Sequence, residues 1–328
     1  MKRNNRYVTQ YIILLSVVFA SFFVSCQSVS YTTTKVQTLN PPARNINLPD
    51  TANIAIVVLL TETENDSLKS LDSTMLTKIA MSLKNNLEES PKYNSYIFPV
   101  YTINTGENEL TQEDIAEIKA NSAADYLISV ERFKARISNK LVRTISENYI
   151  HIIVPHQASI KVYDINNFSI VDNRQIKDTL FLQINLHSWE TDQDAAAQIP
   201  DPKTSLQMVC TQMAKAYVEE IVPYWKEETR YYYLNPTIRN AQMYIENEEW
   251  SRAMNIWAEY VDDTDKTLAA ISCFNMALGC EMIGEYELAL KWMENVKRKK
   301  PEYYWEGYKA RIEQRISEKT AIDKIMKQ

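Results

Sequence analysis

The side chains that most often carry out chemistry are few in this chain, and their spacing fits no catalytic pattern. The three histidines, His151, His156 and His187, lie in no HExxH zinc motif, and no GxSxG nucleophile elbow is present. His151 and His156 are five residues apart, so on one strand they would face opposite sides. Solvated strand faces are the simpler interpretation. We expect no catalytic residue, no metal and no cofactor.

The cysteines suggest structure rather than reactivity. Beyond Cys26 the chain holds Cys210, Cys273 and Cys280, in no CxxC or Cys/His arrangement that would hold zinc. Cys273 and Cys280 would lie about 10 Å apart along one helix, beyond the roughly 7 Å between the Cα atoms of a disulfide. We expect buried thiols.

Two further chemistries remain open. The 42 acidic residues could supply the carboxylate pair of a glycan-active enzyme, because such a pair is assembled by tertiary structure and leaves no sequence motif. The aromatic runs Tyr224-Trp225 and Tyr231-Tyr232-Tyr233 could stack on a glycan or a peptide. The alternative for these rings is packing between two domains.

Composition narrows the class of protein. The 328 residues are 45% hydrophobic and 24% charged, which is typical of a folded protein of about two domains. A net charge of −6 gives no reason to expect nucleic acid. Only 4 glycines occur, where average usage would give roughly 23, so glycine-rich nucleotide-binding loops are not expected.

The first 25 residues are typical of a targeting segment. A basic start (Lys2, Arg3, Arg6) precedes the uncharged apolar run from Tyr11 to Val24. This run of about 14 residues is shorter than the ~20 that a spanning helix needs. It predicts a signal peptide rather than a membrane span.

The end of this segment, Phe23-Val24-Ser25-Cys26, resembles a loose bacterial lipobox. The resemblance implies that Cys26 is lipidated and holds the protein at a membrane; an ordinary signal peptide with an incidental cysteine is the alternative. Gln27 is not the aspartate that marks inner-membrane retention in lipoproteins, and no acidic residue occurs before Asp50. We expect the outer membrane, on its periplasmic face.

The next 200 residues predict a flexible tether and an α/β domain. The tether, residues 26–50, is rich in Thr, Asn and Pro. The apolar run Ile54–Leu60 predicts a central strand buried on both faces, and spacings of three and four predict a helix over Ser67–Ser90. Further predicted elements are a strand at 96–101, a helix at 112–119 capped by Thr111, a strand at 124–136, a long antiparallel hairpin over 150–184 and a helix at 206–221. The predicted order is βαβαβββα.

This order resembles the small α/β domain of the curli secretion lipoprotein and of the amino-terminal part of the Tol-system translocation protein. The residues that carry the resemblance are Asn53–Leu60, Ala124–Ile128 and Ile160–Ile165. It implies an oligomeric secretion or translocation component as an alternative function, although fold does not fix function.

From Asn235 onward the pattern is helical and repeats itself. Trp250-Ser251-Arg252-Ala253 returns 36 residues later as Tyr286-Glu287-Leu288-Ala289, and Trp257 corresponds to Met293. The second copy resembles a tetratricopeptide repeat, with Gly284 at the turn and Pro301 as terminator. The first copy lacks both the turn glycine and the final proline.

The whole chain resembles a family of uncharacterised Bacteroidota lipoproteins with carboxy-terminal tetratricopeptide-like repeats. Besides the lipobox, the segments that carry this resemblance are Asn40–Arg44, Asn47–Pro49 and Ala310–Arg315. The family brings no established activity.

The sequence therefore predicts an α+β protein with four parts: a lipoprotein signal peptide (1–25), a tether (26–50), an α/β domain (51–223) and a helical repeat domain (224–328). We expect a non-catalytic envelope protein, anchored to the membrane through Cys26, that binds a protein or peptide partner. Alignment to the repeat pattern places the candidate partner-binding residues in a concave groove. These are Gln242, Ile245, Glu246, Phe274, Leu278, Glu281 and Met282. The alternative for this largely apolar set is a core beneath the terminal helix.

Overall fold

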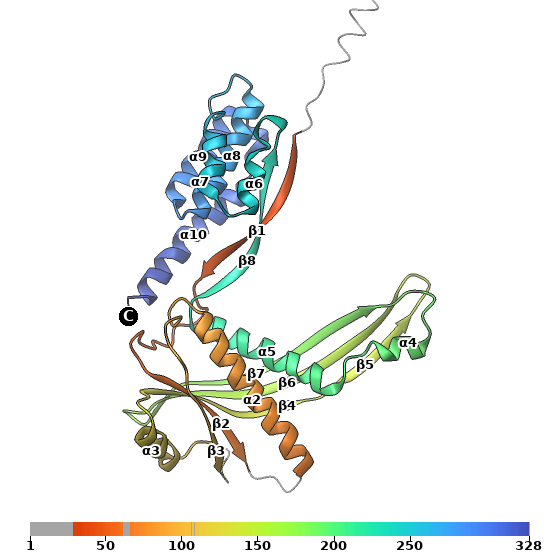
Figure 1. Ribbon diagram of the computed structural model, residues 1–328, viewed down its shortest axis with the longest axis vertical. Coiled ribbons are helices and arrows are strands. Elements are labelled where there is room, and N and C mark those ends of the chain that lie inside the picture. The colour runs from red at the N-terminus through yellow and green to blue at the C-terminus, as the bar shows by residue number, and fades with distance from the viewer. Residues whose placement is uncertain (1–28, 62–65, 106, 108, 328) are drawn as a thin grey trace, which may run out of the picture. The chain divides into compact units, whose positions relative to one another are not determined.

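The computed structural model describes residues 29–61, 66–105, 107 and 109–327, which form a mixed α and β protein with a sheet-rich part followed by a helical part (Figure 1). The chain divides into two compact units. The sheet unit contains Gln37–Lys226 and the described residues from Ser317 onward. The helical unit contains Glu227–Ile316 and the described residues up to Val36. The predicted signal peptide and Cys26 lie outside the described residues.

The sheet unit is built around strand β2 (Ile54–Thr61), which pairs in parallel with β3 (Val100–Thr105) and with β4 (Tyr126–Ala135). In this register Ile56 lies beside Val100 on one side and beside Ile128 on the other. The side chains from Ala55 to Leu59 are fully buried. The prediction of a central strand buried on both faces is confirmed.

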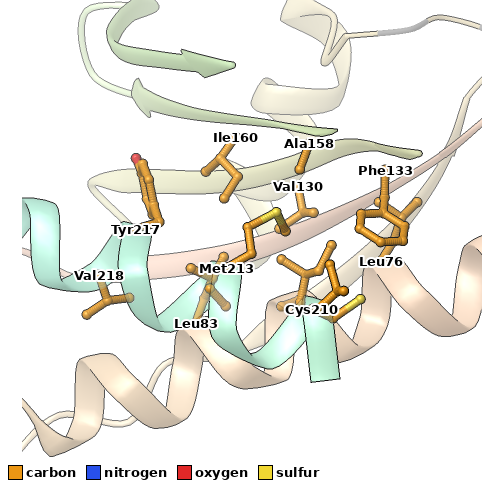
Figure 2. Close-up of a cluster of buried hydrophobic side chains, with 14 of the residues drawn as sticks. Leu76, Leu83, Val130, Phe133, Ala158, Ile160, Cys210, Met213, Tyr217 and Val218 are labelled. Carbon is orange, nitrogen blue, oxygen red and sulfur yellow. The ribbon is translucent and has the colours of Figure 1, made fainter. Parts of the chain in front are cut away.

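Helices cover both faces of this sheet. On one face α2 (Asp66–Glu89) and α5 (Pro202–Ile221) pack on a set of alternating strand residues that includes Ile56 and Val58. On the other face α3 (Gln112–Asn121) packs on the intervening residues, including Val57. Figure 2 shows side chains of α2, α5, β4 and β6 pointing toward one another in the larger core. Each fully buried aliphatic side chain there contributes roughly 1.5–3 kcal/mol.

A long antiparallel hairpin extends the sheet. Strand β6 (Asn148–Asp164) pairs with β7 (Ser169–Asn185) along its whole length, from Tyr149 opposite Asn185 to Asp164 opposite Ser169. The predicted hairpin is thus confirmed. The predicted order βαβαβββα lacks two elements that the structure contains, the strand β5 (Ser138–Arg143) and the short helix α4 (Asp192–Ala197). Strand β5 pairs with β6 alone and is mostly exposed, so it shows little apolar alternation in the sequence.

The predicted flexible tether over residues 26–50 is wrong for its described part. Strand β1 (Ser30–Asn40) pairs with β8 (Tyr224–Leu234) in a two-stranded sheet, and β8 was likewise not predicted. The Thr38 hydroxyl donates to the Lys226 carbonyl at 3.3 Å. Because two isolated strands bury little apolar surface, their sequences carry many polar residues and look like a linker.

The segment after β1 is also fixed to the sheet unit. The Arg44 guanidinium donates to both oxygens of Asp172 at 2.8 and 3.3 Å and to Glu220 at 3.1 Å. Tyr217 donates to the same Asp172 carboxylate at 2.9 Å, and the Leu48 side chain is buried in the larger core. Residues 41–50 are therefore part of the fold.

The helical unit contains two helix hairpins with the same turn geometry. The first joins α6 (Ala241–Glu246) to α7 (Trp250–Ala258), and the second joins α8 (Lys266–Met282) to α9 (Tyr286–Lys299). Its other helices are two short 3-10 turns, Pro236–Ile238 and Pro301–Tyr303, and the first part of α10 (Glu306–Ile325).

Both hairpin turns close with a Schellman motif. In the first, the amides of Glu248 and Glu249 donate to the carbonyls of residues 245 and 244. In the second, the amides of Gly284 and Glu285 donate to the carbonyls of residues 281 and 280, 36 positions later. The left-handed residue is Glu248 (φ 57°) in the first turn and Gly284 (φ 81°) in the second.

The packing repeats with the same spacing. Ala253 and Ala289 are fully buried, as the close approach of two helices requires. Trp257 and Met293, four residues further on, are buried as well and belong to the core of the helical unit. The 36-residue repeat read from the sequence thus corresponds to two hairpins of the same local geometry.

The two turns give a paired prediction. A glutamate in the left-handed conformation is strained by about 1 kcal/mol relative to glycine, so Glu248→Gly should stabilise the protein by about that amount. Gly284→Ala should destabilise it by a similar amount for the same reason. Thermal melts of the two variants measure this. Shifts of the same sign in both variants would contradict the assigned turn geometry.

The fixed amino-terminal segment gives a second prediction. A chain that begins at Thr51 lacks β1, the Arg44 ion pairs and buried Leu48, so it should be clearly less stable than a chain that begins at Gln27. Urea unfolding of both chains measures the difference. Equal midpoints would show that residues 27–50 do not contribute to stability.

Candidate functional site

An open cavity of about 290 Å³ in the helical unit is lined by aromatic residues, and we call it the aromatic pocket. Strand β1 supplies Tyr31, β8 supplies Tyr231–Tyr233, α8 supplies Phe274, and the residue just before α10 is Trp305. Its rim is exposed: Tyr31 by 66%, Tyr231 by 42% and Trp305 by 47%. Phe274 and Tyr232 also line it and are buried.

The rim rings hold one another in place. Tyr231 makes edge-to-face contacts with Tyr31 and with Trp305, at centroid distances of 5.8 and 5.9 Å. The Trp305 ring also stacks on Tyr308. A Cβ atom on Gly307 would lie 2.8 Å from Nε1 of Trp305, so the indole occupies space that only a glycine leaves open. The rim is therefore preorganised.

A buried network of charges lies next to the pocket residues. The Arg230 guanidinium donates to Glu281 at 2.7 and 3.0 Å and to Glu228 at 2.7 Å. Arg311 donates to Glu228 at 2.8 Å, and the Tyr308 hydroxyl donates to Glu281 at 2.7 Å. The network joins β8, which carries Tyr231, to α8, which carries Phe274, and to α10, which follows Trp305.

Pairing outweighs burial in this network. Burial by itself raises the pKa of the Glu228 carboxyl, but the hydrogen bonds and charges of Arg230 and Arg311 lower it below its ordinary value. Burial also lowers the pKa of Arg230, and the bonds to Glu281 and Glu228 more than compensate. Burial and the Glu281 charge raise the pKa of Tyr308 well above its usual range. Glu228, Arg230 and Tyr308 therefore each keep one protonation state near neutral pH.

The pocket is suited to contact rather than to proton transfer. Its lining offers ring faces, phenol hydroxyls and one indole NH. Burial raises the pKa of Tyr232 and of Tyr233, so both hydroxyls stay protonated at neutral pH. Rings of this kind bind apolar or stacked groups at one end and water or polar groups at the other.

The sheet unit holds a second cavity, of about 340 Å³, where β2, β3 and β4 begin. Its lining includes Asn53, Tyr96, Pro99 and Ser122 and contains no charged side chain. Elsewhere on the sheet, Lys161 pairs with Glu131 at 3.1 Å and with Glu109 at 2.9 Å, and Tyr163 donates to Glu131 at 2.6 Å. Lys161 and Glu131 are buried, so this cluster balances charge within the fold.

The thiols are buried, as predicted. Cys210, Cys273 and Cys280 are free cysteines in the interior, and burial raises the pKa of Cys210 to about 12 and of the other two to about 11. Such thiols react slowly at neutral pH.

Within the described part of the chain, no three His, Cys, Asp or Glu residues are grouped to hold a metal ion. No helix there has the length and apolar character to cross a membrane.

The structure separates the seven predicted groove residues. Ile245, Phe274, Leu278 and Glu281 are buried in the helical unit, and of these four Phe274 lines the aromatic pocket. The side chains of helix α8 form part of the core of the helical unit. For these four residues the structure therefore agrees with the alternative interpretation, that they belong to a core. Gln242 and Met282 are half-buried and Glu246 is exposed. A partner-binding role for these three stays a prediction.

The sequence identified only part of the aromatic pocket. The sequence offers Tyr231–Tyr233 for stacking on a ligand, with packing between two domains as the alternative. The structure places these three residues within the helical unit, with Tyr232 in its core. Tyr31 and Trp305 were missed. A strand-like alternation in Ser30–Asn40 could have indicated Tyr31, whereas nothing near Trp305 indicated that it would lie beside Tyr231.

Comparison with protein families gives two matches. Residues 46–233 match a family described as a domain of unknown function (DUF8603), and residues 239–320 match another described as a domain of unknown function (DUF6340). No curated protein matches the chain.

Similar solved structures are distant. A minor lipoprotein from Acinetobacter baumannii is 11% identical with a TM-score of 0.21, and the match covers 51% of this chain and 89% of that one. A putative neuraminyllactose-binding hemagglutinin homolog from Helicobacter pylori is 11% identical with a TM-score of 0.26, covering 55% and 96%. The hypothetical protein CT253 from Chlamydia trachomatis is 14% identical with a TM-score of 0.19, covering 50% and 95%. Likenesses this weak carry no argument about function.

The charge network predicts a pH dependence. Because the pKa of Glu228 is lowered in the folded state, its contribution to stability is present above the ordinary pKa of 4.5 and is lost as the pH falls through the lower folded value. Glu228→Gln should therefore reduce stability at pH 7 and flatten its decline in acid. Melts followed by tryptophan fluorescence measure this, with exposed Glu259→Gln as the matched control. Parallel acid profiles for wild type and Glu228→Gln would contradict the assignment.

Proposed function

The chain belongs to the family described as a domain of unknown function (DUF8603), and from that premise we propose that it is a non-catalytic, lipid-anchored protein of the cell envelope whose helical unit binds a partner. The observation that carries the proposal is the leader that ends in Ser25-Cys26. Val29, three residues beyond that cysteine, packs against the core of the helical unit. Because only three positions separate Cys26 from Val29 in the sequence, a lipid on Cys26 would hold the helical unit close to a membrane.

The proposed location is the outer membrane, on its periplasmic face. Gln27 after the cysteine, rather than aspartate, favours release from the inner membrane, and residues 27–49 carry no acidic side chain that would suggest export to the surface. The proposal also includes the resemblance, described above, to Bacteroidota lipoproteins with carboxy-terminal tetratricopeptide-like repeats.

The proposal that the protein is not an enzyme is supported by the ion pairs that its buried charged side chains form. Lys161 with Glu131, and Arg230 with Glu281, are paired within the fold, and the lining of the two cavities described above is uncharged. Groups engaged in this way are not poised to exchange protons with a substrate. Turnover of a polysaccharide or peptidoglycan fragment that is lost on replacing one buried acid would favour an enzyme instead.

The partner-binding part is supported by the repeat geometry. The two hairpins share a Schellman turn, a buried alanine and a large buried side chain at a spacing of 36 residues, which fits a tetratricopeptide-like array. Such arrays bind proteins or peptides along their helix surfaces. Of the predicted partner-binding residues, Gln242, Glu246 and Met282 are the ones that remain accessible for this role.

Lipid attachment is tested directly. Metabolic labelling with a palmitate analogue should mark the wild-type protein and should be lost in Cys26→Ser, because this cysteine alone follows the apolar run and a small residue. Cys210→Ser is the matched control and should keep the label, since that thiol is buried. Label that persists in Cys26→Ser would refute the lipid anchor.

A further inference from the structure

We propose that the rim of the aromatic pocket, formed by Tyr31, Tyr231 and Trp305, rests in the headgroup layer of the membrane that holds the lipid of Cys26. The proposal deepens the proposed function and rests on its lipid anchor. It assigns the exposed aromatic surface of the helical unit to one occupant, the lipid–water interface.

The first argument is the length of chain between the lipid and the fold. Val29 is already packed on the core of the helical unit, and Tyr31 lies in β1 and lines the pocket. An extended chain spans at most about 3.6 Å per residue, so the Cα atom of Tyr31 lies within about 18 Å of that of Cys26. A lipid on Cys26 therefore keeps this side of the helical unit close to the bilayer surface.

The second argument is the chemistry of the rim. Tyr and Trp concentrate at membrane interfaces, because the apolar ring faces the acyl chains while the hydroxyl or the indole NH stays hydrated. The three rim side chains are 42–66% exposed, so their ring faces lose contact with water on docking. A single acyl chain holds a protein weakly, and a second apolar contact strengthens such an anchor.

The third argument is that the rim is rigid and carries little charge. Tyr231 lies between Tyr31 and Trp305, and the glycine at position 307 leaves room for the indole. On the same two strands, Lys35 and Glu227 lie four residues from Tyr31 and Tyr231 and pair with each other at 2.8 Å. The rings themselves are uncharged and reach a membrane without reordering.

A glycan or peptide could stack on the same rings. The distance to the anchor favours the membrane, because a surface held this close to the bilayer meets headgroups at far higher local concentration than any soluble ligand. The experiment below distinguishes these occupants, since a ligand site that faces away from the bilayer would leave the rings remote from the lipid.

The test couples the chain from Cys26 onward to maleimide-bearing phospholipid in phosphatidylcholine vesicles that contain brominated acyl chains. Coupling is selective for Cys26, because the other three thiols are buried. Bromine quenches the fluorescence of a tryptophan that enters the bilayer. We expect quenching in wild type and loss of the larger part of it in Trp305→Phe. The matched control is Trp189→Phe, which changes an exposed tryptophan of the sheet unit and should leave the quenching unchanged.

A second variant guards against a folding defect. Tyr31→Ser keeps Trp305 and alters the most exposed rim residue, so it should weaken the quenching while thermal melts stay close to wild type. Quenching that is absent in wild type, or unchanged in both rim variants, would overturn the proposal. Chemical coupling makes the result independent of lipidation in cells, so failure of the membrane contact and failure of the Cys26 anchor give separate readouts.

Discussion

The pairing of β1 with β8 holds the first described strand in place, and the aromatic pocket depends on it. Tyr31 contacts Tyr231 and Lys35 contacts Glu227, so the contacts run in opposite directions along the two strands, as in an antiparallel pair. Strand β1 brings Tyr31 into the aromatic pocket. Without this pairing, Tyr31 would not be held beside Tyr231, and a lipid on Cys26 would not favour one surface of the helical unit for contact with the membrane.

The helical unit depends on a second constraint, the buried ion pair of Arg230 and Glu281. Both side chains are almost inaccessible. Arg230 also pairs with Glu228, and Glu281 also accepts a hydrogen bond from the Tyr308 hydroxyl. Removing one partner from such a pair costs about 3–5 kcal/mol, because the other charge is left buried and uncompensated. The network therefore ties β8 to α8 and α10 and stabilises the elements that carry the pocket rings. The acidic residues of this network stabilise the fold. This explains why Glu281, which the sequence analysis places in a partner-binding groove, is buried in the helical unit.

The aromatic pocket and the charge network have complementary roles. The network joins elements that are distant in sequence, whereas the pocket leaves three large rings exposed at the surface. Soluble proteins rarely gather exposed aromatic side chains without an interaction to cover them. Such a surface fits the proposed lipid anchor at Cys26 and the proposed contact with the membrane.

The sequence by itself determined the elements with strong local patterns. Continuous apolar residues in Ile54–Leu60 identified the central strand, period-two alternation identified the β6–β7 hairpin, and the 36-residue repeat identified the two helix hairpins. Strands β1, β5 and β8 were missed, because edge and two-stranded pairings bury few side chains and leave no apolar period. Only the tertiary structure decided that Tyr31, Tyr231 and Trp305 meet. Contacts between residues this distant in sequence depend on how the elements pack and leave no trace in local spacing. For the same reason the sequence did not indicate the pairing of Arg230 with Glu281. Glu281 was predicted to lie at the surface and is buried in the structure.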